Sequence, residues 1–237
     1  MTHGLGRVPS PPDVRDHALS MHVPNLALVI ATLPANVSTR PGLPILDQGQ
    51  TSECVGYSGA LQRFVGERLD EHDPALRFDA PELYARCKEK DGDPTGDGTS
   101  MRVAAQILLD RGMIVDRATN PAELGKVRPI SAYAALRSLD EIKATIYLFG
   151  SAWVGSDWPD NWFDVRGTLP APGSIAGGHA YSFVGYSDRR QAFRQQNNWS
   201  ASWADGGRIW FPYRFVTFGS GLGFEAWRTI DVKGDRS

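Results

Sequence analysis

The stretch DQGQTSECVGYSGA, residues 47–60, contains Cys54, one of only two cysteines in the 237-residue chain. Downstream, the apolar residues Leu61, Phe64 and Val65 recur at helical spacing, so Cys54 is predicted in the first turn of a helix. At that position, unpaired backbone N–H groups and the positive end of the helix dipole lower the pKa of a thiol. Packing, a disulfide, metal ligation and nucleophilic attack all remain open as roles for Cys54.

The composition excludes several classes of protein. Hydrophobic residues make up 41% of the chain, which is enough for a substantial core. The formal net charge is −2 and the basic residues are scattered, which argues against nucleic-acid and membrane partners. Two cysteines cannot form a disulfide scaffold or a four-cysteine zinc site.

The N-terminal region predicts a cytoplasmic protein. The longest apolar stretch, Leu26–Leu33, is far shorter than the roughly 20 residues that span a bilayer. The preceding segment MTHGLGRVPSPPDVRDH lacks the basic-then-apolar layout of a secretory signal. Export by a non-classical route stays open.

The chain divides into a helical and a strand-rich part. Four prolines make residues 1–33 an N-terminal arm with one short apolar segment. Capping pairs and apolar spacing predict three more helices, beginning near Asp79, Met101 and Ser138.

After His179, β-branched and aromatic residues predict strands, including 206–213 and 224–232. Segment 156–164, SDWPDNWFD, is interpreted as a surface loop. The predicted fold class is α+β.

A nucleophilic thiol needs a group to carry its proton and a further group to orient that carrier. His179, in GGHAYSFVGY, is the histidine predicted to open a strand, whereas the others lie in the arm or just after a helix. Asn197 and Trp199 follow in NNWSASW, at 197 − 179 = 18 positions from the histidine. The separations from the cysteine are 179 − 54 = 125 and 197 − 54 = 143.

This order and spacing resemble the papain-like cysteine peptidases, whose His and Asn follow the cysteine by roughly 130 to 150 residues. The resemblance runs from about Leu33 to near the C-terminus. Its motifs are the mature N-terminus with Gln-Gly-x-x-x-x-Cys in LPANVSTRPGLPILDQGQTSEC, the His-Ala strand in GGHAYSFVGY, and the Asn-x-Trp segment in NNWSASWADGGRIWF. PSPPDVRDH further resembles bacterial members without a long propeptide.

The resemblance implies a two-lobed fold for residues 34–237. A helical lobe of about 47–125 would face an antiparallel β-rich lobe of about 126–237, with the active-site cleft between them. It also implies catalytic roles for residues of both lobes. Cys54 would be the nucleophile and His179 its base, Asn197 would orient the imidazole, Gln48 would stabilise the oxyanion, and Trp199 would cover the His–Asn pair.

The resemblance also implies where a peptide would bind. Gly98, Thr99 and Met101 would form an edge that pairs with the substrate backbone, and Trp203 would line the leaving-group side. Ala180 would face the pocket for the residue two before the scissile bond, with Met101 opposite. That pocket is therefore predicted to favour an apolar residue. No metal and no organic cofactor are expected.

The signature departs from the family around the cysteine. Thr51-Ser52-Glu53-Cys54-Val55 stands where the family has Cys-Gly-Ser-Cys-Trp, and a carboxylate at Glu53 would raise the pKa of the thiol. The expected function is a cysteine peptidase acting on a peptide or protein through an acyl-enzyme. The alternatives are a catalytically silent peptide-binding homologue, or an acyl-transferase such as a transpeptidase or ligase with the same triad. The oligomeric state stays open.

Overall fold

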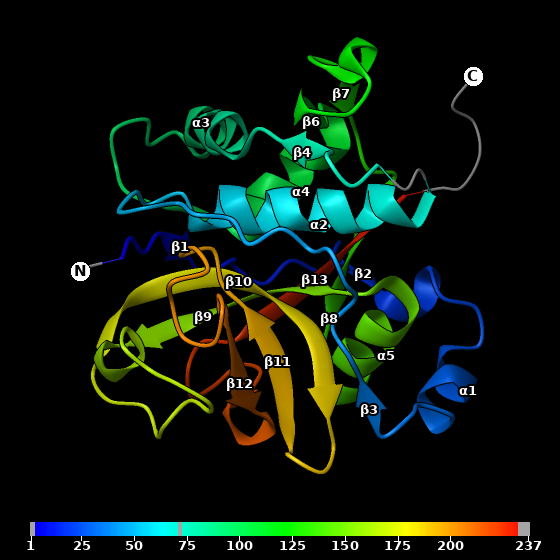
Figure 1. Ribbon diagram of the computed structural model, residues 1–237, viewed down its shortest axis with the longest axis vertical. Coiled ribbons are helices and arrows are strands. Elements are labelled where there is room, and N and C mark those ends of the chain that lie inside the picture. The colour runs from blue at the N-terminus through cyan, green and yellow to red at the C-terminus, as the bar shows by residue number, and fades with distance from the viewer. Residues whose placement is uncertain (1–2, 71–72, 232–237) are drawn as a thin grey trace.

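Two layers make up the computed structural model, which describes residues 3–70 and 73–231. In Figure 1 a group of helices with a small sheet lies above a large, mainly antiparallel sheet. One cluster of buried apolar side chains lies within the strand-rich layer, and the other joins the helices to strands of the large sheet. The predicted α+β class with two lobes is confirmed.

The helical layer is built around α2, which begins at the cysteine. Its helices are α2 (Cys54–Asp70), α3 (Ala80–Asp91) and α4 (Met101–Asp110), and its small sheet has β4 (Arg77–Phe78), β6 (Met113–Arg117) and β7 (Val127–Arg128). Asp79 caps α3 by accepting from the backbone N–H of Glu82, and Ser100 caps α4. All three helices were predicted, α3 from its capping residue Asp79 and α2 and α4 from the spacing of their apolar residues.

The second layer is an eight-stranded sheet within the described residues. Its order is β12, β11, β10, β9, β13, β8 and β2, and β3 pairs with β10. The strands are β2 (His17–Ala18), β3 (Asn36–Val37), β8 (Ala132–Leu136), β9 (Ala152–Pro159), β10 (Ile175–Ser187), β11 (Ala192–Gln196), β12 (Arg208–Pro212) and β13 (Glu225–Ile230). Helices α1 (Leu26–Ala31) and α5 (Leu139–Phe149) pack at one side of this sheet, α5 being capped by Ser138 as predicted. Short 3₁₀ turns are at Leu19–Met21, Pro121–Glu123, Asp160–Trp162 and Tyr213–Phe215.

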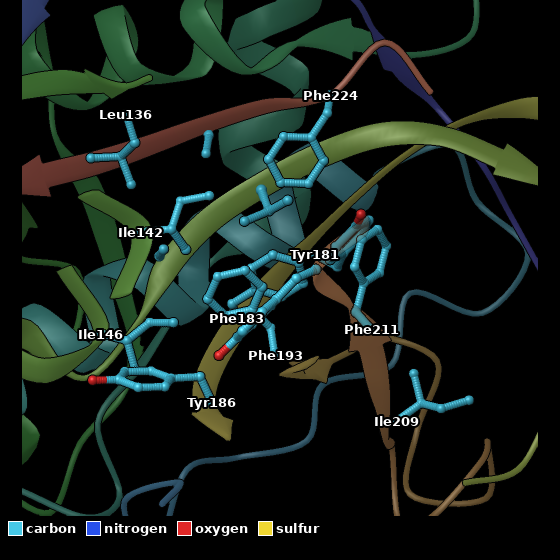
Figure 2. Close-up of a cluster of buried hydrophobic side chains, with 14 of the residues drawn as sticks. Leu136, Ile142, Ile146, Tyr181, Phe183, Tyr186, Phe193, Ile209, Phe211 and Phe224 are labelled. Atoms are coloured by element: carbon cyan, nitrogen blue, oxygen red, sulfur yellow. The ribbon is translucent and has the colours of Figure 1, made fainter. Parts of the chain in front are cut away.

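Aromatic side chains fill the core under the sheet. Figure 2 shows Tyr181 and Phe183 of β10 beside Phe193, Phe211 and Phe224 from neighbouring segments. The rings of Phe183 and Phe193 stack with their centroids 4.5 Å apart. This packing makes the long strand β10 a rigid support for the side chains on it, including His179.

Two predictions about this sheet are wrong in detail. His179 does not open its strand but is the fifth residue of β10, because Ile175–Gly178 already pair with β9. Segment 156–164 is not a surface loop: its first residues end β9, and Trp158 and Trp162 are fully buried. The burial of the aromatic residues favours the strand, and Pro159 does not prevent it because proline is tolerated at the end of a strand. Predicted strand 224–232 is β13, and residue 232 lies outside the described residues.

The N-terminus of α2 is held close to its neighbours by a glycine. A Cβ on Gly56 would lie 2.4 Å from the carbonyl oxygen of Ala80, so a side chain there would push α3 away. The turn before α2 contains Gly49 at φ +61°, and its N–H donates to the carboxylate of Asp47. Turn and helix together set the position of Cys54. Within the described residues, the helices include none with the length and apolarity to cross a lipid bilayer.

A buried network of charges joins α2 to the rest of the helical lobe. Glu67 bonds to Arg63 one turn earlier and accepts from Arg128 Nη1 at 2.8 Å. Arg63 also donates to both carboxylate oxygens of Asp231, at 2.7 and 2.8 Å. The side chains of Glu67 and Arg63 have no exposed surface, so each charge depends on its partners for solvation.

We expect Glu67→Gln to lower the free energy of unfolding by about 3 kcal/mol, because it leaves two buried guanidinium groups without their shared carboxylate. Chemical denaturation measures the change. The matched control is Asp110→Asn, which breaks an exposed pair with Lys90 and should cost less than about 1 kcal/mol. Equal effects of the two substitutions would contradict the structural role of the network.

Candidate active site

Cys54 is the first residue of α2 and has no exposed surface. Burial raises the pKa of its thiol to about 12, while backbone N–H groups of Ala180, Val55 and Gly6 interact with the sulfur in the opposite sense. Ala180 follows His179 directly on β10. The thiol therefore lies beside the strand that carries the histidine.

His179 is fully buried and is paired with Asn197. Its Nε2 lies 2.7 Å from Asn197 Oδ1, and that oxygen also accepts the backbone N–H of Asn198 at 2.9 Å. Because this oxygen only accepts, the imidazole donates through Nε2, so Nδ1 of the neutral ring is an acceptor. Within the described residues Nδ1 has no hydrogen-bond partner. Burial lowers the pKa of His179 to about 3, against the raising effect of the hydrogen bond with Asn197.

Two tryptophans enclose the imidazole. Trp199 stacks on His179 with ring centroids 4.4 Å apart, and Trp158 meets it edge-on at 4.9 Å. Trp203 in turn meets Trp199 edge-on at 5.6 Å. Trp199 was singled out from the sequence, whereas Trp158 fell in the predicted surface loop 156–164, because its place two residues beyond the partner of His179 depends on strand register.

Gln48 lies on the other side of the cysteine, in the turn before α2, and is buried. Its side-chain Nε2 donates to the carbonyl of Gly4 at 3.2 Å and to that of Thr51 at 2.7 Å, and its Oε1 accepts from Asn198. Gln48, Cys54, His179 and Asn197 are therefore gathered in one place by α2, its preceding turn and the sheet.

The N-terminal segment runs across this group of residues. In Figure 1 it passes between α2 and β10. Gly6 donates its N–H to the carbonyl of Gly178 and accepts the N–H of Thr99, both at 2.9 Å. Strand β1 (Arg7–Val8) then pairs in parallel with β5 (Thr99–Ser100). The predicted substrate edge is thus occupied by the chain itself.

The contact between segment and body is closest at two glycines. A Cβ on Gly98, which has φ +81°, would lie 2.2 Å from the carbonyl oxygen of Gly6. A Cβ on Gly178 would lie 2.1 Å from the carbonyl oxygen of Arg7. Any larger residue at either position would push the segment away.

The first described residues complete the cover. The ring of His3 stacks on Trp199 at 4.5 Å, and Trp199 Nε1 donates to the Gly4 carbonyl at 3.3 Å. The carbonyl of Gly4 therefore receives both the Trp199 indole and the Gln48 amide. With this cover in place, the thiol and the imidazole are both held in their neutral forms.

Comparison with solved structures identifies the fold. Xylellain, a cysteine protease from Xylella fastidiosa, matches with a TM-score of 0.84 at 22% identity over 98% of this chain and 97% of its own. Procathepsin B S9 from Trypanosoma congolense matches with a TM-score of 0.70 at 16% identity, over 98% of this chain and 87% of its own. The Carica candamarcensis cysteine protease CMS1MS2, in complex with E-64, gives 0.64 at 16% identity, over 85% and 100%.

The chain has the papain-like fold. No protein-family model matches its sequence, and no curated protein matches it either. Within this fold, Cys54 at the start of α2 lies beside β10, and Gln48, His179 and Asn197 are linked to the same place through Asn198 and Ala180. Among the residues described, no three His, Cys, Asp or Glu side chains form a group that could hold a metal ion.

Sequence reasoning missed three residues that lie beside this site. Arg7 of the arm is buried, and its guanidinium bonds to Glu225 and Asp157 of neighbouring strands. Glu225 lies opposite Gly155 and Asp157 two residues further on, so both carboxylates share the face that carries Ala180. No local motif marks them, because only the register of three strands brings them together.

Proposed function

We propose that the chain is a cysteine peptidase that hydrolyses peptide bonds through Cys54, His179 and Asn197. The observation that carries this proposal is the 2.7 Å contact between His179 Nε2 and Asn197 Oδ1. Ala180, the next residue after His179 on β10, interacts with Cys54 at the N-terminus of α2. A neutral imidazole with a free Nδ1 can take the thiol proton. The helix N-terminus then stabilises the thiolate.

The reaction proceeds in two steps. The Cys54 sulfur attacks the carbonyl carbon, and His179 passes the thiol proton to the leaving amine, which departs as the new N-terminus. Water, deprotonated by His179, then attacks the thioester, releases the new C-terminal acid and restores the thiol. Gln48 Nε2 and the backbone N–H of Cys54 receive the oxyanion, and such a donor is worth about 3 kcal/mol in related sites. Asn197 keeps the imidazole in the required tautomer.

The N-terminal arm keeps this peptidase latent. Gly4 meets Gln48 and Trp199 on the leaving-group side, and Arg7 lies on the opposite side, beside β5. The arm therefore runs from the leaving-group side toward the pocket, whereas a substrate would run the other way. Because the chain direction of the arm is opposite to that of a substrate, its peptide bonds are not oriented for attack by the thiol. The arm therefore blocks the site without being cut.

Two alternatives use the same fold. A silent peptide-binding homologue would keep the groove but not the chemistry, and an acyl-transferase would pass the acyl group to an amine instead of water. The apolar preference predicted from Ala180 and Met101 also remains a prediction. The Arg7 side chain lies in the pocket beside these two residues, and the groups around it favour a different side chain at that substrate position.

Product analysis in ¹⁸O-labelled water tests the proposal. The full chain with Gly6→Pro and Arg7→Ala, hereafter the open-arm variant, loses the Gly6 N–H and the Arg7 guanidinium that hold the arm. We expect it to cut peptides of a mixed library and to place one ¹⁸O in each new carboxyl group. Transfer to an added amine with no labelled acid would favour the acyl-transferase. Bound peptides that stay intact would favour the silent homologue.

A further inference from the structure

The side chain of Arg7 sits in a receptor with three oxygen acceptors. Its Nε donates to Glu225 Oε1 at 2.8 Å, its Nη2 to the carbonyl of Gly223 at 2.6 Å, and its Nη1 to Asp157 Oδ1 at 3.4 Å. Only 1% of this side chain is exposed. A charged group buried this deeply needs all of these contacts.

The three acceptors line a pocket beside Ala180 and Met101. The resemblance to papain-like peptidases implied that this pocket binds the residue two before the scissile bond. Ala180, Gly155 and Glu225 lie side by side on β10, β9 and β13. Gly155 leaves a gap in this row, since a Cβ there would lie 2.6 Å from Met101 Sδ and 3.1 Å from Arg7 Nε. The Arg7 side chain thus fills the space between Ala180 and Met101 on one side and the Glu225 carboxylate on the other.

The receptor belongs to the body of the protein and not to the arm. Glu225 is oriented by the indole N–H of Trp227, which donates to its Oε2 at 2.9 Å. Asp157 is fixed at the end of β9, where its backbone N–H donates to the Leu222 carbonyl at 2.7 Å. Both carboxylates therefore remain in place when the arm leaves.

An empty pocket would then contain two carboxylates without their cation. An apolar side chain entering it would remove water from both carboxylates without providing a hydrogen bond or a compensating charge. A guanidinium would restore the fork of donors that Arg7 provides, with its methylene groups lying against Met101 and Ala180. The pocket thus selects by repulsion as well as by attraction.

We infer that this pocket is an arginine-binding subsite, and that the protein acts on peptides with arginine two residues before the scissile bond. This inference rests on the proposed peptidase function. It revises the apolar preference expected from Ala180 and Met101, which form only the walls of the pocket. In the latent chain, Arg7 is the internal ligand of this subsite.

The first test measures cleavage by the open-arm variant. Three fluorogenic dipeptide amides differ only at the position in question, which holds arginine, its neutral isostere citrulline, or leucine. We expect kcat/KM for arginine to exceed that for citrulline by about tenfold to a hundredfold, the range of a partly buried charge-assisted pair. Adding Glu225→Gln should reduce this ratio by about tenfold or more, whereas Glu89→Gln, at an exposed site on α3, should leave it unchanged.

The second test does not depend on turnover. The open-arm variant with Cys54→Ala is titrated by calorimetry with an arginine peptide and with its citrulline counterpart. Tighter binding of the arginine peptide, lost with Glu225→Gln, supports the subsite even if no peptide is ever cut. Equal binding of the two peptides, or cleavage that favours leucine and ignores Glu225→Gln, would overturn the inference and leave the peptidase function standing.

Discussion

Replacing Cys54 by alanine in the open-arm variant is expected to lower kcat by about 10⁵-fold to 10⁶-fold, the scale on which loss of a nucleophile acts in related triads. In the proposed mechanism the thiol sulfur forms the bond to the substrate, so this substitution removes the nucleophile. His179→Ala should cost a similar factor, because the thiol then has no proton acceptor. Initial rates with a fluorogenic peptide provide the measurement.

The combined effect of these substitutions is a sharper test than either alone. If Cys54 and His179 act as one unit, the double substitution should cost no more than the worse single one. Cys87 is the matched control, since it is the other free and buried cysteine, and Cys87→Ala should leave the rate within about threefold. Losses that multiply, or activity that survives Cys54→Ala, would refute the proposed roles.

Opening the arm is expected to raise the rate of Cys54 alkylation by iodoacetamide at pH 7 by about a thousandfold or more. In the covered chain, burial raises the pKa of the thiol to about 12, so the thiol is almost entirely un-ionised at pH 7. In the open-arm variant the helix N-terminus and a protonated His179 would stabilise the thiolate. Intact mass and peptide mapping follow the reaction over time.

Cys87 again provides the internal control for alkylation. Burial raises the pKa of its thiol to about 12 as well, but it lies within α3 and the arm does not cover it. Its labelling should stay slow in both forms of the chain. Equal labelling of Cys54 with and without the arm substitutions would contradict latency, and equal acceleration at Cys87 would indicate general unfolding instead.

Acid should also release the arm. Burial against Trp199 lowers the pKa of His3 in the covered state below its ordinary value of 6.5. The covered state therefore binds fewer protons at His3 than the open one, so this part of its stability is complete above pH 6.5 and falls as the pH drops below 6.5. This loss adds to the opening expected from Gly6→Pro and Arg7→Ala. Hydrogen exchange of residues 3–8, corrected for intrinsic rates, would follow it.

The helices were predictable because their signals are local. Asp79, Ser100 and Ser138 each cap a helix through a backbone N–H three residues later, so a short window of sequence contains the whole interaction. The proximity of Cys54, His179 and Asn197 was predictable for another reason. Their order and spacing form a pattern that resembles a known family, and the chain has the fold of that family.

The sequence by itself determined which residues are proposed to carry the chemistry: a thiol at a helix start, His179 in a strand, and an Asn-x-Trp segment. Only the tertiary structure decided what surrounds them. The arm lies over Cys54 through backbone hydrogen bonds of Gly6, which leave no side-chain pattern in the sequence. Glu225 and Asp157 reach Arg7 across 218 and 150 positions of chain, through the register of β9 and β13. Strand register and chain crossing are global properties, so the charged pocket could not be predicted from local residue patterns.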